Sequence, residues 1–298
     1  MSPSAAPSIP FRIRKMLRAT PGLTTALNSA RAILHFGPWR HAARAAIRRA
    51  RPPRYGQATL PAGGVSLDAR ALARTLRQDG MARAGQLPAE ALDRVRAITE
   101  GLPPGEYADF HDQPDVRALV LGSGVLDVVR TYLGAEPELL ECNLVVGHAE
   151  DPARTPIHVQ RHFHFDFAGW ESLNLFVYLT DVDDDSGAHQ VVLGTHHSRL
   201  LRDALRPWVP DEEIGARYPD RVRTIAGPAG TMFFESTEAF HRRLIFKRRR
   251  AMLNVLYASH RSWASRGRLT PRYADHARAK AGLNATPPER EASGGAAA

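Results

Sequence analysis

The sequence predicts a mainly β domain, with a sandwich or jelly-roll core and helices packed against it from the N-terminal side. Up to residue 133, apolar residues recur at helical spacing. From residue 138 onward they fall into eight short β-rich runs separated by Gly-, Pro- and Asp-rich turns. The length is the third observation, because 298 residues exceed the roughly 200–250 that one barrel commonly uses. We therefore expect a domain over 65–280, with its strand core at about 138–258.

The segment before this domain, residues 1–64, is expected to be a basic extension that is partly helical. Residues 1–67 contain eleven Lys and Arg and no Asp or Glu, whereas the rest of the chain has 29 basic and 31 acidic residues. Within it, residues 38–50 predict a helix on which three arginines recur at i, i+4 and i+8, namely Arg40, Arg44 and Arg48. The simplest expectation is a helix packed on the domain with its arginine face in water.

Other interpretations of the basic segment remain open. An anionic membrane surface bound through residues 1–55, an acidic partner and a mitochondrial transit peptide are each compatible with arginine-rich, acid-free sequence. Motifs that read bases through interleaved aromatics are absent from the sequence, which disfavours nucleic acid. No run of about 18 apolar residues predicts a membrane span. The single cysteine, Cys142, excludes an internal disulfide framework, and a cytoplasmic location, peripheral to a membrane at most, is expected.

The elements of the domain follow from local patterns. Helices are expected over 68–78, 87–102 and 115–133, the last interrupted near Gly122 and Gly124. Strands are expected over 138–147, 161–167, 173–180, 190–193, 222–225, 231–235, 239–246 and 250–258. The insertion at 194–221 is expected to be helical and to act as a lid, and the tail at 281–298 to be disordered.

One strand carries the candidate chemistry. His164 and Asp166 lie two apart in an alternating run, so that in an extended strand their side chains share a face. A second histidine from a distant strand, His241, would complete two imidazoles and one carboxylate, the set that holds one face of Fe(II) and leaves three positions open. His162 shares the same strand face and is the alternative first ligand in another register.

At these residues the sequence resembles the phytanoyl-CoA dioxygenase family of Fe(II)- and 2-oxoglutarate-dependent oxygenases. The matching features are His-Phe-Asp at 164–166, the strand at 175–187, Val-Val-Leu-Gly-Thr-His at 191–196, Gly-Thr-Met-Phe-Phe-Glu leading to His241, and Leu-Arg-Gln-Asp-Gly-Met at 76–81. The resemblance covers roughly residues 68–260. It implies a double-stranded β-helix of the cupin-like kind, and hydroxylation of an unactivated C–H bond with release of succinate and CO₂.

The resemblance also implies roles for particular residues. His164, Asp166 and His241 would ligate Fe(II), and Arg250 would hold the distal carboxylate of 2-oxoglutarate, since a guanidinium can grip a carboxylate with two parallel hydrogen bonds. Arg248 and Arg249 directly precede it, so either of them is an alternative for this role. O₂ is the implied second co-substrate, with ascorbate as a reductant.

Further polar and aromatic residues are candidates for contacts in the pocket. Asn143 and Gln160 are expected to hydrogen-bond the co-substrate, and His162, Trp170 and His196 to contact the substrate. The expected substrate is a small molecule or an acyl- or lipid-linked compound. Two other classes remain as alternatives: a cupin-like metal-binding or isomerising protein without 2-oxoglutarate turnover, and a membrane-associated binding protein that uses the basic N-terminus.

Overall fold

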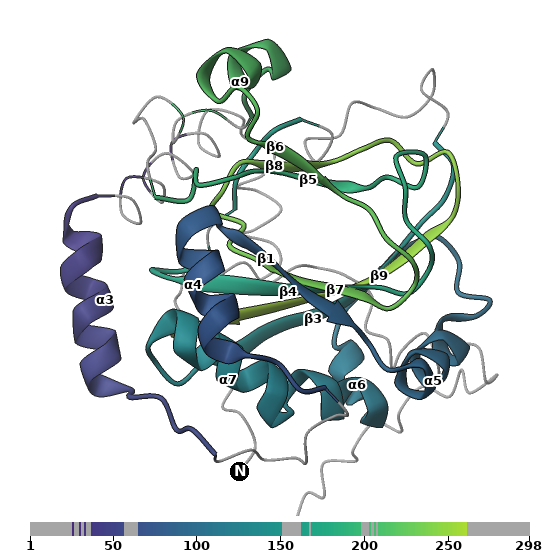
Figure 1. Ribbon diagram of the computed structural model, residues 1–298, viewed down its shortest axis with the longest axis horizontal. Helices are drawn as coiled ribbons and strands as arrows, with labels where there is room; N and C mark the ends of the chain where they lie inside the picture. The colour runs from purple at the N-terminus through teal and green to yellow at the C-terminus, as the bar shows by residue number, and fades with distance from the viewer. Residues whose placement is uncertain are drawn as a thin grey trace, which may run out of the picture.

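The computed structural model describes residues 37–56, 65–150, 162–166, 168–197 and 208–260, together with Ala26, Ala30, Ile33, Asp203 and Arg206. Two antiparallel β-sheets face each other across the interior (Figure 1). The larger sheet has the order β1 (Met81–Gln86), β7 (Thr231–Glu235), β4 (Ser172–Tyr178), β9 (Arg250–Ala258), β3 (Glu138–Gly147) and β2 (Gly105–Tyr107). The smaller sheet has the order β6 (Val222–Ile225), β5 (His189–Val192) and β8 (His241–Arg243).

Helices cover the outer face of the larger sheet (Figure 1). They are α4 (Ala69–Asp79), α5 (Ala89–Thr99), α6 (Pro114–Val120) and α7 (Ser123–Leu133), with the 3₁₀ turn η1 (Phe110–Asp112) between α5 and α6. The first of these is well delimited: the Asp68 side chain accepts a hydrogen bond from the Ala71 amide, and Gly80 ends the helix in the left-handed conformation.

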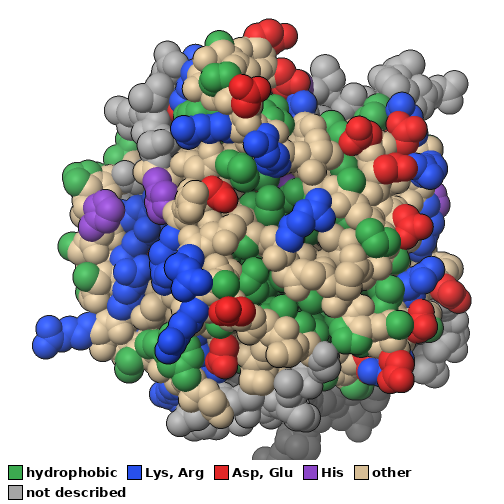
Figure 2. Space-filling view, viewed as in Figure 1, with side chains coloured by type: hydrophobic (Ala, Val, Ile, Leu, Met, Phe, Trp, Pro, Cys, Tyr) green, Lys and Arg blue, Asp and Glu red, His purple; other side chains and the backbone are tan. Residues whose placement is uncertain are grey.

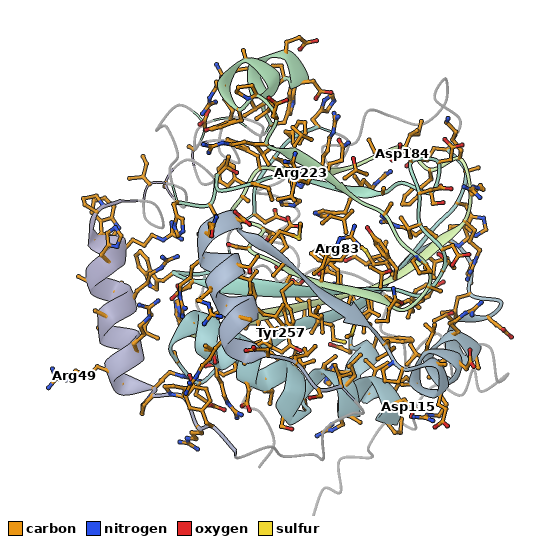
Figure 3. The ribbon with its side chains drawn as sticks, viewed as in Figure 1. Arg49, Arg83, Asp115, Asp184, Arg223 and Tyr257 are labelled. Atoms are coloured by element: carbon orange, nitrogen blue, oxygen red, sulfur yellow. The ribbon has the colours of Figure 1, made fainter. Side chains whose placement is uncertain are left out.

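The alternation of β9 divides the interior into two regions. Leu253, Val255 and Tyr257 belong to the main hydrophobic core under the helices, and the Tyr257 hydroxyl donates to the Val120 carbonyl at 2.8 Å (Figure 3). The residues between them point to the other face, toward the smaller sheet. Arg250, Met252, Asn254 and Leu256 accordingly line the cavity between the two sheets. The larger sheet is therefore apolar on its helix-facing side and polar at intervals on its cavity side.

Most of the predicted elements are present, and the jelly-roll class is confirmed. The predicted strands 138–147, 222–225, 231–235 and 250–258 have the observed bounds, and the interrupted third helix is the pair α6 and α7. The sequence did not predict β1 and β2. Two predicted strands are shorter: around 161–167 the described residues form isolated bridges at Phe163 and His164, and 239–246 reduces to β8.

Other predictions are confirmed only in part or lie outside the described residues. In the insertion at 194–221, a helix is formed by α9 (Asp211–Arg217), and Ile214 of that helix packs with Phe163, Val192, Val209 and Phe240. The tail at 281–298, the expected domain end at 280 and most of residues 1–36 lie outside the described part of the chain. None of the described helices is long and apolar enough to cross a membrane.

The helix predicted from 38–50 is α3 (Trp39–Ala50), which stands at one side of the sheets (Figure 1). The expectation that its arginine face lies in water is wrong. Arg40 and Arg44 are half-buried against the domain, whereas Trp39 on the other face is 45% exposed. Figure 2 shows basic side chains gathered over this helix. Arg40 and Arg44 face the domain because they form ion pairs with two buried carboxylates, those of Glu171 and Glu238.

Candidate metal centre and cavity

His164 and His241 are brought together by a backbone bridge between the two strands that carry them. The His164 amide donates to the His241 carbonyl at 3.0 Å, and the His241 amide donates to the His164 carbonyl at 2.8 Å. In such a hydrogen-bonded antiparallel pair, the two side chains project on the same face. Their rings accordingly lie 4.4 Å apart between centroids.

Asp166 joins this pair from the same segment as His164. Its amide donates to the Thr237 carbonyl at 2.7 Å, which fixes the segment beside the loop that leads to His241. One carboxylate oxygen, Oδ2, lies 3.7 Å from His241 Nε2. One possible ligand atom from each of His164, Asp166 and His241 lies within 4.8 Å of the other two. This spacing fits three ligands on one face of a single metal ion.

The tautomers of the two histidines suit metal binding. His164 Nδ1 donates to the His162 carbonyl at 2.9 Å, and His241 Nδ1 donates to the Ala239 carbonyl at 3.0 Å. A backbone acceptor on Nδ1 leaves Nε2 as the atom available to a metal ion. Burial lowers the pKa of His241 to about 4, so this ring is neutral at pH 7, as ligation requires. The chemistry of these donors therefore fits Fe(II).

Arg250 is the arginine that faces the cavity. It is 2% exposed and lines the cavity with the three candidate ligands, whereas Arg248 and Arg249 are exposed. Its Nη1 donates to the Gly187 carbonyl, and its guanidinium lies 4.8 Å from the centroid of the Phe246 ring. Burial lowers the pKa of Arg250 to about 10, so it stays protonated at pH 7. Its Nε lacks a hydrogen-bond partner among the described residues, which leaves a buried cationic donor available to an anionic ligand.

A second buried polar pair lies beside the candidate ligands. His189 Nε2 lies 2.8 Å from Glu235 Oε2, and the His189 ring stacks on His241 with centroids 5.4 Å apart and planes 9° from parallel. Burial raises the pKa of Glu235 to about 8 and lowers that of His189 to about 3, so both groups are mainly neutral at pH 7. This pair was not predicted from the sequence. The available signal was Glu235 itself, an acid that directly follows the apolar run Met-Phe-Phe in a strand.

The cavity between the sheets has a volume of about 250 Å³. Its wall holds the candidate ligands and Arg250 and, elsewhere, a set of carboxylate and amide side chains: Glu106, Glu141, Asn174 and Asn254. Asn174 Nδ2 donates to Asn254 Oδ1 at 2.8 Å, and the Thr237 hydroxyl donates to Asn174 Oδ1 at 3.1 Å. The cavity therefore combines a cationic residue with carboxylate and amide groups and with apolar side chains such as Val146, Met252 and Leu256.

The other predicted contact residues lie in different surroundings. Asn143 is buried and its amide donates to Glu106 at 2.9 Å and to Glu141 at 3.4 Å, so it acts on the cavity through these two acids. The His162 ring stacks on the Trp208 ring, with centroids 4.5 Å apart. The group of possible metal ligands contains His164 and not His162. Gln160 lies outside the described residues.

Trp170 and His196 lie toward α3 rather than with the candidate ligands. The Trp170 carbonyl accepts hydrogen bonds from Arg40 and Arg44. His196 lines a second cavity, of about 200 Å³, together with Arg44, Arg48, Glu171 and Glu238. Both residues lie outside the lining of the cavity that holds the candidate ligands, and their substrate contacts stay predictions.

The fold and the site together define a double-stranded β-helix with a His-x-Asp…His candidate metal centre between its sheets. No family model matches the chain. Over 183 residues it is 26% identical to L-proline trans-4-hydroxylase from Streptomyces griseoviridis, an alignment that covers 49% of this chain and 64% of that protein. The chain thus spans less than two thirds of the length of this relative.

Solved structures resemble the chain in fold. EctD from S. alaskensis superposes with a TM-score of 0.53 at 17% identity, over 74% of this chain and 90% of that chain. HygX from Streptomyces hygroscopicus, solved with nickel and 2-oxoglutarate bound, gives a TM-score of 0.49 at 15% identity, over 67% and 89% of the two chains. The likeness to EctD supports the jelly-roll fold. Membership of the phytanoyl-CoA dioxygenase family itself stays a prediction, because no family model matches.

Proposed function

We propose that this chain is an Fe(II)- and 2-oxoglutarate-dependent dioxygenase that hydroxylates an unactivated C–H bond of a small-molecule substrate, with release of succinate and CO₂. One observation carries the proposal: the same cavity holds a His-Asp-His ligand set and a buried arginine whose Nε has no hydrogen-bond partner among the described residues. The first suits Fe(II), and the second suits the free carboxylate of a dicarboxylic 2-oxo acid. The similarity to L-proline trans-4-hydroxylase agrees with it.

Each residue has a defined task in this proposal. His164, Asp166 and His241 hold the metal ion, and the backbone acceptors of the two histidines fix the ring orientations. Arg250 grips the distal carboxylate, which orients the other end of the 2-oxo acid toward the metal. Iron and the 2-oxo acid, held by these residues, would supply the activation of O₂, and ascorbate would keep the iron ferrous.

The cavity wall favours a polar substrate over an acyl chain. Glu106 and Glu141 provide hydrogen-bond acceptors, which match ammonium or hydroxyl groups of a substrate, and they stand beside apolar side chains such as Met252 and Leu256. A hydrocarbon chain would leave these groups desolvated without replacing the lost hydrogen bonds to water. We therefore infer a small substrate rich in hydrogen-bond donors, such as an amino acid or an aminated or hydroxylated ring compound, rather than a lipid-linked one.

The experiment is succinate formation by the purified protein with Fe(II), 2-oxoglutarate and ascorbate, in air and without oxygen, across a panel of amino acids, amino sugars and acyl compounds. Oxygen-dependent succinate formation that rises with a polar panel member, together with a product one oxygen atom heavier by mass spectrometry, is expected. His164→Ala should abolish it, whereas His111→Ala, on η1 away from the cavity, should not. Equal succinate formation by wild type and His164→Ala would refute the proposal. Turnover of a substrate without 2-oxoglutarate would favour the cupin-like alternative.

A further inference from the structure

Helix α3 contacts the domain through its arginines. Arg48 Nη2 donates to both carboxylate oxygens of Glu171 at 3.0 Å, and Arg48 Nε donates to the Leu133 carbonyl at 2.9 Å. Arg44 Nε donates to the Trp170 carbonyl at 2.7 Å. The guanidinium of Arg44 also lies between two acids, 3.8 Å from Glu171 and 3.5 Å from Glu238. Arg40 completes the series with an ion pair to Glu238.

The two acids that receive these arginines are buried. Glu171 is 6% exposed and Glu238 is 2% exposed. A carboxylate so far from water is tolerated when cationic hydrogen-bond donors compensate it, and removing one partner of such a pair is strongly destabilising. Because residues 39–50 supply these donors, α3 provides charge that the domain needs at this point.

The two acids also lie in the loops that carry the candidate metal ligands. Glu171 follows Asp166 by five residues, and Glu238 precedes His241 by three. The loops are joined directly on their inner side, where the Asp166 amide donates to the Thr237 carbonyl at 2.7 Å. The arginines therefore hold both loops from outside, while Asp166 and His241 project inward from them.

We propose that α3 is a clamp that pre-organises the metal centre, with Arg44 as its main positioning residue because it contacts Glu171, Glu238 and the Trp170 carbonyl together. The inference rests on the proposed function only in taking His164, Asp166 and His241 as metal ligands. It assigns three arginines of α3, Arg40, Arg44 and Arg48, a role inside the molecule. Without the clamp, the loops that contain Glu171 and Glu238 separate and metal binding weakens. This loss of affinity is distinct from a loss of folding stability.

Co(II) titrated into the metal-free full-length protein tests this clamp, with affinity from calorimetry and ligand geometry from the visible absorption of bound Co(II). Arg44→Ala is expected to weaken Co(II) binding on the order of tenfold, as changes outside the first ligand shell commonly do. Arg49→Ala is the matched control, because Arg49 lies on the same helix and points away from the domain (Figure 3); it should leave binding unchanged. Arg44→Lys keeps the charge but not the forked donor geometry, and should recover part of the affinity.

A second arm separates positioning from general destabilisation. Arg44→Ala leaves the buried Glu238 charge with Arg40 as its remaining cationic partner. Glu238→Gln removes that charge, so the double variant should bind Co(II) more tightly than Arg44→Ala alone. Should Arg44→Ala fail to fold, Arg48→Ala, whose side chain is 45% exposed, replaces it. If folded variants melt earlier yet bind Co(II) as tightly as Arg49→Ala, the clamp is refuted while the metal centre stands. If the His164→Ala variant binds Co(II) as tightly as the wild type, the metal centre and the proposed function fail instead.

Discussion

Glu235 on β7 and His189 on β5 meet across the interior, so that the larger and the smaller sheet are joined by a polar contact of 2.8 Å next to His241. Glu235 is fully buried, and Phe176 and Phe233 pack against the His189 ring at 5.1 and 5.7 Å. A carboxyl group in such surroundings favours its neutral form, which has a measurable consequence for stability.

Replacing Glu235 is expected to change how the stability of the metal-free protein depends on pH. Its pKa is raised from 4.5 to about 8, so between these values the folded state holds a proton that the unfolded state has lost, and stability falls as pH rises. The lowered pKa values of His189 and His241 act below 6.5, in the opposite direction. Between pH 6.5 and 8 the effect of Glu235 therefore stands alone among these three groups.

The measurement is urea unfolding at several pH values in that window. The wild type should lose stability with a slope approaching one proton, about 1.4 kcal/mol per pH unit, and Glu235→Gln should remove that slope. Glu90→Gln, an exposed acid in the first turn of α5, serves as the control and should leave the slope in place. Identical pH profiles for wild type and Glu235→Gln would contradict the burial argument.

Arg250 is expected to govern affinity for 2-oxoglutarate without affecting the metal. Arg250→Leu should weaken 2-oxoglutarate binding to the Ni(II)-loaded protein by about a hundredfold, because charge-assisted hydrogen bonds contribute about 1.5–3 kcal/mol each. Calorimetry with Ni(II) and then 2-oxoglutarate separates the two affinities. Arg248→Leu is the control, since Arg248 pairs with Asp183 at the surface. A larger loss from Arg248→Leu than from Arg250→Leu would reassign the anchor.

The candidate ligands could be predicted because their signals are local or ordered along the chain. The spacing of His164 and Asp166 places both on one strand face, and a strand-rich segment leads to His241. The long, largely apolar strands β3 and β9 could also be predicted from the sequence, with the bounds that the structure has. By contrast, β1 has the sequence Met-Ala-Arg-Ala-Gly-Gln, which lacks β-branched residues, and it forms because the edge of β7 is available to pair with it.

The orientation of α3 could not be derived from its own sequence. Its apolar side chains suggested which face would be buried, yet Arg44 faces inward because Glu171 and Glu238, more than 120 residues away, are buried there. The pairing of His189 with Glu235 could not be predicted for the same reason. The two residues are 46 positions apart, and neither is part of a sequence motif with a known spacing. Charge partners distant in sequence decide these features, and local periodicity carries no information about them.

Cys142, the single cysteine, is expected to resist thiol reagents in the folded protein. It is 1% exposed on β3, and burial raises the pKa of its thiol well above the ordinary value, so the reactive thiolate is scarce and inaccessible. Iodoacetamide at pH 8 should leave the native protein unmodified by mass spectrometry and label it once in urea. Native labelling at the rate of the unfolded chain would show that β3 opens readily.

Gly187 and Gly85 form a matched pair for testing how tightly the Arg250 end of the cavity is packed. Both have positive φ, of +68° and +89°, where any other residue is strained. A Cβ on Gly187 would lie 2.5 Å from the Phe246 ring, which itself stacks on Arg250, whereas a Cβ on Gly85 meets nothing within 4 Å. Gly85→Ala should therefore cost only the backbone strain, about 1 kcal/mol, and leave 2-oxoglutarate binding unchanged.

Gly187→Ala should cost that strain and a further 1–3 kcal/mol, roughly, from overpacking against Phe246. The Arg250 guanidinium contacts the Phe246 ring and donates to the Gly187 carbonyl. Gly187→Ala shifts both of these groups, so it should also displace Arg250 and weaken 2-oxoglutarate binding. Urea unfolding and calorimetry on the Ni(II)-loaded protein measure the two effects separately. Equal losses for Gly187→Ala and Gly85→Ala in both measurements would mean that Phe246 yields freely and does not fix Arg250.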